Sequence, residues 1–148
     1  MGFSRLGELR AKLEFAPQLL TTIMGDAIVG HREEIADLIT EQIQKGETPE
    51  MAPIRPKYKN SDYAKKKQQR NPKPAFGTPD LTDTGAFVRS IRIDVFGDGF
   101  EPRATDSKAP ALLAKYGAVV GLSTMSVARI QQEILKPILH RKIKAYLV

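Results

Sequence analysis

Residues 78–96 read TPDLTDTGAFVRSIRIDVF, and the rest of the predicted fold is arranged around this segment. Its first half is polar and rich in turn-forming residues. From Ile91 to Val95 every second residue is apolar, which is the period of a strand with one buried face. Gly97-Asp98-Gly99 then predicts a three-residue hairpin loop, and residues 100–105 predict the returning strand. The stretch is therefore a turn that leads into a β-hairpin.

The residues before this stretch predict two helices. Apolar residues recur at spacings of three and four over 4–13, where Ser4 can cap the helix, and over 17–45. Gly46 supplies a left-handed stop for the longer helix. Gly25 and Gly30 interrupt that helix, and we expect a bend at one of them.

The residues after the hairpin predict a short helix from Asp106 or Ser107 and a closing helix over 123–148, which Pro137 should kink. The predicted fold class is α+β: long N-terminal and C-terminal helices packed on a small antiparallel β-sheet, with a long Pro/Lys-rich extended loop. We expect one domain over 1–148. It divides into a helical part (1–45), a basic Pro-rich extended arm (46–80), the β-hairpin with short helices (81–122) and the closing helix (123–148).

Composition restricts the classes of protein that the chain can belong to. Of its 148 residues, 41% are hydrophobic and 27% are charged, which is ordinary for one soluble globular domain. No stretch approaches the ~18 to 20 apolar residues that span a membrane. The charged N-terminus predicts no secretion signal. Cysteine is absent, which excludes disulfides, thiolate nucleophiles and cysteine-ligated metal sites.

The net charge of +6 is concentrated in one segment. Residues 55–73 carry eight basic side chains against one acid, Asp62, which gives a local charge of +7. The basic residues are Arg55, Lys57, Lys59, Lys65, Lys66, Lys67, Arg70 and Lys73. Prolines forbid helix through most of 46–80, and only 62–69 predicts a short helix, capped by Ser61 or Asp62. A connection this long is usually either functional or disordered until a partner orders it. Its basic charge favours a function, so we expect the basic side chains to contact a partner.

His31 and Glu34 lie three residues apart, a spacing that can place both on one metal ion. One histidine and one carboxylate do not complete a coordination shell, and no second histidine lies nearby. We therefore predict no metal site, and the sequence predicts no cofactor.

The string Asp83-Thr84-Gly85-Ala86 also occurs around the catalytic carboxylate of aspartic proteases. Such an enzyme needs two of these carboxylates sharing one proton, so one copy per chain implies a dimer. Thr82 is polar where those enzymes carry an apolar residue, and this chain is helical at both ends. The alternative is a capped turn in which Asp83 or Thr82 accepts backbone N–H groups, Gly85 permits the turn and Phe87 packs inward. We expect the capped turn.

A longer pattern resembles the neck and tail-completion proteins of tailed bacteriophages, also called virion-morphogenesis or minor head–tail connector proteins. In that family a leucine precedes Thr-Gly-Arg-Leu-x-x-Ser-Ile, with a Tyr and Lys-rich stretch upstream and a strand downstream. The matching residues here are Leu81, Thr84, Gly85, Phe87, Ser90 and Ile91. Ala86 replaces the family's Arg and Phe87 its Leu. Met51-Ala-Pro-Ile54, a following tyrosine and the lysines 65–67 resemble the upstream part, and the resemblance covers about 46–117.

The resemblance implies a structural virion protein without catalytic residues, assembled in the host bacterial cytoplasm and located at the head–tail junction or in the tail. Its partners would be further copies of itself in a ring, together with portal, adaptor or tail-tube proteins. The extended arm would wrap neighbouring subunits. The basic side chains have three interpretations: contact with an acidic partner surface, non-specific contact with passing DNA, or a solvated loop. A small basic DNA-binding protein of the packaging or virion machinery is the alternative function, followed by the dimeric protease.

Overall fold

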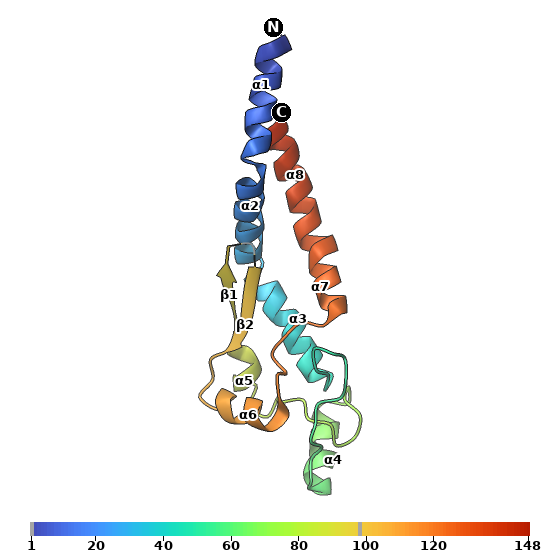
Figure 1. The fold of residues 1–148 in the computed structure, drawn as a ribbon. Coiled ribbons are helices and arrows are strands. Elements are labelled where there is room, and N and C mark those ends of the chain that lie inside the picture. Colours follow the sequence, from blue (N-terminus) through green and yellow to red (C-terminus); the bar gives the residue numbers. More distant parts are fainter. Residues whose placement is uncertain (1, 98) are drawn as a thin grey trace.

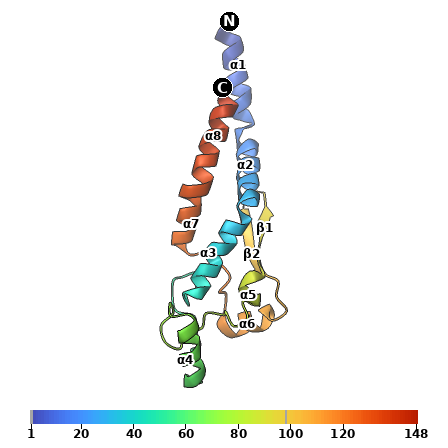
Figure 2. The ribbon, with the colours of Figure 1, turned by 180° about the vertical axis from the view of Figure 1, so that it is seen from behind.

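The fold is α+β, as predicted, and it is described by a computed structural model covering residues 2–97 and 99–148. Figure 1 shows an elongated molecule in which a helical stalk leads to a β-hairpin and a group of short helices. The stalk combines α1 (Gly2–Glu14) and α2 (Ala16–Gly30) with a C-terminal rod. That rod contains α7 (Thr124–Ile130), the π-helix η1 (Gln131–Leu135) and α8 (Lys136–Leu147). Both termini lie at the same end (Figure 2).

The core lies where α3 (Arg32–Gln44) packs against the hairpin. Strands β1 (Ile91–Phe96) and β2 (Gly99–Ala104) form a two-stranded antiparallel sheet with Ile91 opposite Ala104. The buried stripe of α3 has the i, i+4, i+8 spacing of one helix face and contains Ile35, Ile39 and Ile43. α5 (Ala86–Arg89) and α6 (Ala109–Tyr116) lie below the sheet, and α4 (Ser61–Arg70) forms the far end.

The two predicted N-terminal helices are present, with differences at their starts and in the middle. α1 already contains Ser4, so the prediction that Ser4 caps this helix is wrong. The predicted bend in the longer helix is a complete break after Gly30, where His31 separates α2 from α3. Gly46 has φ 75°, which confirms the left-handed stop.

The hairpin is confirmed, but the three-residue loop is not. Gly99 is paired with Phe96 and belongs to β2, so the predicted loop is too long. Asp98, which the prediction placed at the centre of the loop, lies outside the described residues. The sheet register otherwise follows the alternation in the sequence, because Ile91 and Ile93 face the core.

The closing helix contains a π-helical turn just before Pro137. Proline has no N–H to donate to the carbonyl four residues earlier, and the turn before it is widened. The Lys136 N–H bonds to the carbonyl of Gln131, five residues back. The C-terminal rod remains continuous through this turn (Figure 1).

The start of the closing helix agrees with the predicted range, and two predicted helix caps are wrong. Ser123 caps α7, and its hydroxyl accepts from the Ser126 N–H at 3.1 Å. α4 is capped by Asn60, whose side chain accepts two backbone N–H groups, and not by Ser61 or Asp62. Asp106 accepts from the Lys108 N–H at 2.8 Å, which forms a turn just before α6 and not the helix cap itself.

Gly25 is expected to be required where α2 approaches the hairpin. A Cβ atom there would lie 2.5 Å from the carbonyl oxygen of Gly97, whereas a Cβ at Gly30 would meet nothing within 4 Å. We expect Gly25→Ala to lower the free energy of unfolding by about 1–3 kcal/mol, because backbone must move. Gly30→Ala should be neutral or stabilising by up to about 1 kcal/mol. Urea unfolding compares the two, and equal stabilities would contradict the close approach.

Candidate functional site

The residues of the phage-family pattern build the turn that starts the hairpin. Gly85 has φ 79° and precedes α5, and the Thr84 hydroxyl accepts from the Ala86 N–H at 3.3 Å. Phe87 is buried, which confirms the inward packing. The Ser90 hydroxyl donates to the Phe87 carbonyl at 2.7 Å and accepts from the Thr105 N–H at 3.1 Å, so it joins the two ends of the hairpin. Leu81 and Ile91 pack in or against the core.

Asp80, and not Asp83, is the carboxylate that holds the turn together. Its Oδ1 accepts from the Thr82 N–H at 3.0 Å. Asp83 or Thr82 was predicted to accept backbone N–H groups. The Asp83 side chain is instead 69% exposed and lies 3.7 Å from a guanidinium nitrogen of Arg70, and the Thr82 hydroxyl donates to the Asp80 carbonyl at 2.7 Å. The prediction of a capped turn is therefore right in kind and wrong in the residue. The Asp-Thr-Gly-Ala carboxylate lies at the surface.

Lys67 and Asp80 form a buried ion pair, with 2.7 Å between Nζ and Oδ1 and side chains only 6% and 4% exposed. The Lys67 ammonium also donates to the Thr82 carbonyl at 3.0 Å. Asn71 completes the cluster by donating to Asp80 Oδ2 at 3.0 Å and to the Gln44 carbonyl at 2.7 Å. These contacts fasten α4 and the 78–82 turn to the end of α3. Lys67 was predicted to contact a partner, which is wrong, because the inner face of α4 places it inside the protein.

The other seven predicted basic residues are all exposed. Lys65, Lys66 and Arg70 lie on the outer face of α4, which projects at the end of the molecule (Figures 1 and 2). Lys57 and Lys59 precede that helix. Arg55 and Lys73 flank it on the surrounding loops. The structure therefore brings the cations to one end of the molecule, except for the buried Lys67.

The Pro-rich segment around α4 is folded against the body. Ile54 is fully buried, and residues 77–80 are also buried. The Tyr58 N–H donates to the Gly77 carbonyl at 2.9 Å, which closes the segment on itself. The sequence predicted an extended arm that wraps neighbours. In this chain, the part of that arm open to a partner is the outer surface of α4 and its adjoining loops.

Tyr58 should make stability sensitive to alkaline pH. Burial, and next the Asp80 carboxylate, raise the pKa of its hydroxyl above the ordinary 10.0. The unfolded chain then loses this proton at a lower pH than the folded chain, so folding stability falls as pH rises above about 10. Tyr58→Phe should cost less than about 1 kcal/mol at pH 7, since it removes only a long hydrogen bond, which the Tyr58 hydroxyl accepts from the Asp80 N–H at 3.4 Å. We expect this difference to shrink or reverse above pH 10 in urea unfolding, and a constant difference would contradict the shift.

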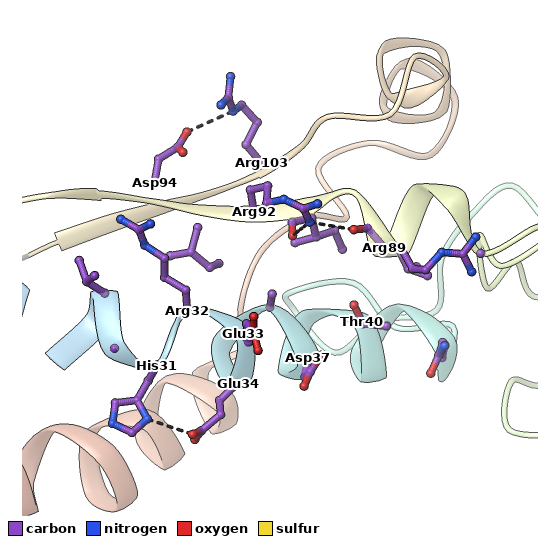
Figure 3. Close-up of a pocket in the computed structure, with 18 of the residues that line it drawn as sticks. His31, Arg32, Glu33, Glu34, Asp37, Thr40, Arg89, Arg92, Asp94 and Arg103 are labelled. Atoms are coloured by element: carbon purple, nitrogen blue, oxygen red, sulfur yellow. Dashed lines mark hydrogen bonds and ion pairs between the residues drawn. The ribbon is translucent and has the colours of Figure 1, made fainter. Parts of the chain in front are cut away.

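A groove lies between α3 and the hairpin, with a volume of about 1120 Å³. Figure 3 shows that both sides of the groove carry charges of both signs, with Arg32 extending from the start of α3 toward the strands and Asp94 on the hairpin side. The lining holds four acids and four arginines: Glu33, Glu34, Asp37 and Asp94, and Arg32, Arg89, Arg92 and Arg103. The His31 ring bonds to the Glu34 carboxylate at 3.0 Å. Within residues 2–97 and 99–148, no group of three or more histidine, aspartate or glutamate residues is placed to hold a metal ion.

Comparisons of the chain with protein-family models, with curated proteins and with solved structures found no match. None of the helices that the structure describes is both long and apolar enough to cross a membrane.

Proposed function

We propose that the chain is a structural protein of a tailed-bacteriophage virion, a subunit of a head–tail connector, neck or tail-completion ring. The observation that carries the proposal is the pattern from Leu81 to Ile91, together with the position of its residues in the fold. Gly85 turns the chain, Phe87 fills the core and Ser90 joins the hairpin ends. Each of these three residues shapes or packs the fold. Such roles are what we expect of a pattern that structural subunits share.

Exposed apolar side chains on the stalk support a role in assembly. Leu6, Leu9 and Leu13 have the i, i+3, i+7 spacing of one helix edge, and each is 42–64% exposed. α1 is tied to the C-terminal rod by the Tyr146 hydroxyl, which donates to the Lys12 carbonyl at 3.1 Å. A fixed helix with a leucine edge in water is suited to contact with another protein. An elongated ring subunit offers such an edge to its neighbours.

Under the proposed function, no residue of the chain is catalytic. Asp83 is exposed beside Arg70, and the fold carries one copy of its motif per chain. An aspartic protease requires two carboxylates that share a proton in a protected cleft. Incubation with a peptide library should therefore give no cleavage. Cleavage that Asp83→Asn abolishes would support the protease instead.

DNA contact is the second candidate, and the exposed cations around α4 favour it. Phosphate contacts need charge and no base readout, so a projecting basic helix can supply them. If α4 binds duplex DNA, exchanging Lys65, Lys66 and Arg70 for Gln should weaken binding and reduce the salt slope by about 0.9 for each lost phosphate contact. An unchanged slope would remove this candidate.

The proposed function is tested by sizing the purified chain with light scattering and imaging it by negative-stain electron microscopy. We expect closed rings, or an oligomer that grows with protein concentration, since a connector subunit must bind its own copies. The salt concentration should be varied in the same experiment, because charged interfaces weaken as salt rises. A strict monomer at every concentration, from a chain also missing from phage particles, would contradict the proposal.

A further inference from the structure

Three of the four tyrosines of the chain line one pocket, which we call the tyrosine pocket. Tyr58 precedes α4, Tyr63 lies on α4 and Tyr116 ends α6, and Figures 1 and 2 show both helices at the end opposite the termini. The rings of Tyr58 and Tyr63 meet edge to face, with 5.0 Å between their centroids. Tyr63 is 40% exposed, so a ligand can reach its ring from solvent. Another flat ring can stack on such a surface.

The tyrosine pocket has room for one planar ring system. Its volume is about 190 Å³, and a cavity of about 150 Å³ already holds a benzene molecule. Leu81, Phe87 and Leu112 supply its apolar lining. The carboxylates of Asp83 and Asp106 also line it, and they can accept hydrogen bonds from amino groups. The pocket therefore fits a flat ring whose edge carries N–H donors.

This end of the molecule remains strongly positive when every charged side chain is counted. Residues 55–90 and 105–117 carry eleven basic side chains against four acids, a local charge of +7. Lys67 and Asp80 neutralise each other inside the protein. The other ten basic side chains are exposed. The surroundings of the pocket therefore attract an anion, although two carboxylates line the pocket itself.

Three of these cations lie beside the tyrosine pocket. Lys108 lines it directly. A guanidinium nitrogen of Arg70 lies 3.7 Å from the carboxylate of Asp83, which is part of the lining. Lys66 lies one helical turn from both Tyr63 and Arg70, on the same side of α4. A ligand can therefore place a ring inside the pocket and its anionic groups on the cations outside.

Single-stranded nucleic acid has both of these features. Its phosphates are anionic, and its unpaired bases expose flat faces that stack on aromatic side chains. Amino groups on the base edges supply donors for the two carboxylates. In a duplex the base faces are stacked on one another and cannot reach the tyrosines. A cationic ligand is repelled by the local charge of +7, and an acidic protein surface would use the lysines without filling the ring-shaped space.

We propose that the tyrosine pocket receives one base of a single-stranded nucleic acid, with phosphates on Lys66, Arg70 and Lys108. Stacking depends on the face of a base, which all bases have, so binding should depend little on sequence. The site goes beyond the proposed structural role. It does not depend on ring formation, because one copy of the chain holds all of these residues.

Fluorescence anisotropy of a labelled ten-nucleotide single strand tests the stacking contact. We expect Tyr63→Ala to weaken binding about 5- to 150-fold, because one base loses its aromatic partner. Tyr63→Phe keeps the ring and should retain the wild-type affinity. Phe76→Ala removes an aromatic side chain that is 52% exposed but lies outside the pocket lining, and it should also leave binding unchanged.

Two neighbouring lysines test the phosphate contacts. Lys65 and Lys66 are both exposed, but Lys65 lies on the side of α4 opposite Tyr63. Lys66→Gln should reduce the salt slope of single-strand binding by about 0.7, the value for one phosphate contact. Lys65→Gln removes the same charge and should leave the slope unchanged. Equal slopes in the two variants would contradict the placement of the strand beside Tyr63.

A duplex of the same length and a poly-glutamate of similar charge are the comparison ligands. Tyr63→Ala should leave the binding of both unchanged, since neither places a ring in the pocket. The site is overturned if Tyr63→Ala binds the single strand with wild-type affinity, or if it loses as much affinity for the comparison ligands. Circular dichroism checks that each variant is folded. A wild-type chain that binds no single strand also overturns the site, whereas the ring is tested separately by light scattering and electron microscopy.

Discussion

Asp80→Asn is expected to lower the free energy of unfolding by about 3–5 kcal/mol, because it leaves a buried ammonium group without its countercharge. The carboxylate balances the buried Lys67 ammonium at 2.7 Å and accepts from the Thr82 N–H and the Asn71 amide. An asparagine removes the charge and offers one acceptor oxygen where three donors converge. One of its amide N–H groups must then face another donor.

Asp83→Asn is the matched control for this prediction. Asp83 lies three residues further along the same turn, is 69% exposed and is 3.7 Å from Arg70. Its substitution should change stability by less than about 0.5 kcal/mol. Urea unfolding at pH 7 measures both variants. Similar losses in the two would show that the Lys67–Asp80 pair does not stabilise the turn.

Gln42→Ala is expected to cost about 2–4 kcal/mol, because one side chain satisfies two backbone groups of the segment before α7. Its amide N–H donates to the Gly121 carbonyl at 3.0 Å, and its carbonyl accepts from the buried Ser123 N–H at 3.0 Å. Gln42 is itself buried in α3. It therefore joins two elements about eighty residues apart in the sequence, and its removal leaves both backbone groups without these partners.

Gln42→Ala should destabilise the segment before α7 locally, in addition to lowering the free energy of global unfolding. Hydrogen exchange of residues 121–126 should accelerate in Gln42→Ala, since the segment loses its attachment to α3. Gln69→Ala, on the exposed face of α4, is the matched control and should change neither stability nor exchange by a measurable amount. Unchanged exchange at Ser123 in Gln42→Ala would contradict the role given to this side chain.

Periodicity in the sequence was enough to predict the main elements. Ile91, Ile93 and Val95 alternate because one face of β1 is buried, and the stripe of α3 repeats every four residues because one face of that helix is buried. Gly46 and Gly85 mark left-handed backbone positions, which few other residues tolerate. Each of these signals lies within a short segment of the sequence, so it can be recognised without knowledge of the tertiary structure.

The roles of individual charged residues depended on contacts that the sequence does not display. Lys65, Lys66 and Lys67 are consecutive lysines, and only the phase of α4 against the body decides that Lys67 is buried. Asp80 and Asp83 are equally good turn residues, and the choice between them depends on Lys67 and Asn71 from another element. The cap of α4 is Asn60 and neither of the two predicted residues, because the sequence only weakly determines the residue at which a helix starts.

The groove was also missed, because its two walls are about fifty residues apart in the sequence. The acidic residues of α3 are visible as a stripe with helical spacing, but an acidic stripe is usually a solvated face. Arg89, Arg92 and Arg103 gain their position only when the hairpin packs beside α3. Such a surface can be identified before a structure is known by assigning each charged residue to a face of its predicted helix and counting the charges on each element.

The most direct test of the proposed virion role is an electron cryo-microscopy reconstruction of the head–tail junction and tail in particles of the phage that, under the proposed function, encodes the chain. We expect a ring of copies of this elongated subunit at the head–tail junction or at the end of the tail, fitted by the hairpin, the stalk and the projecting α4. A reconstruction in which every density at these positions is accounted for by other proteins would contradict the proposed function.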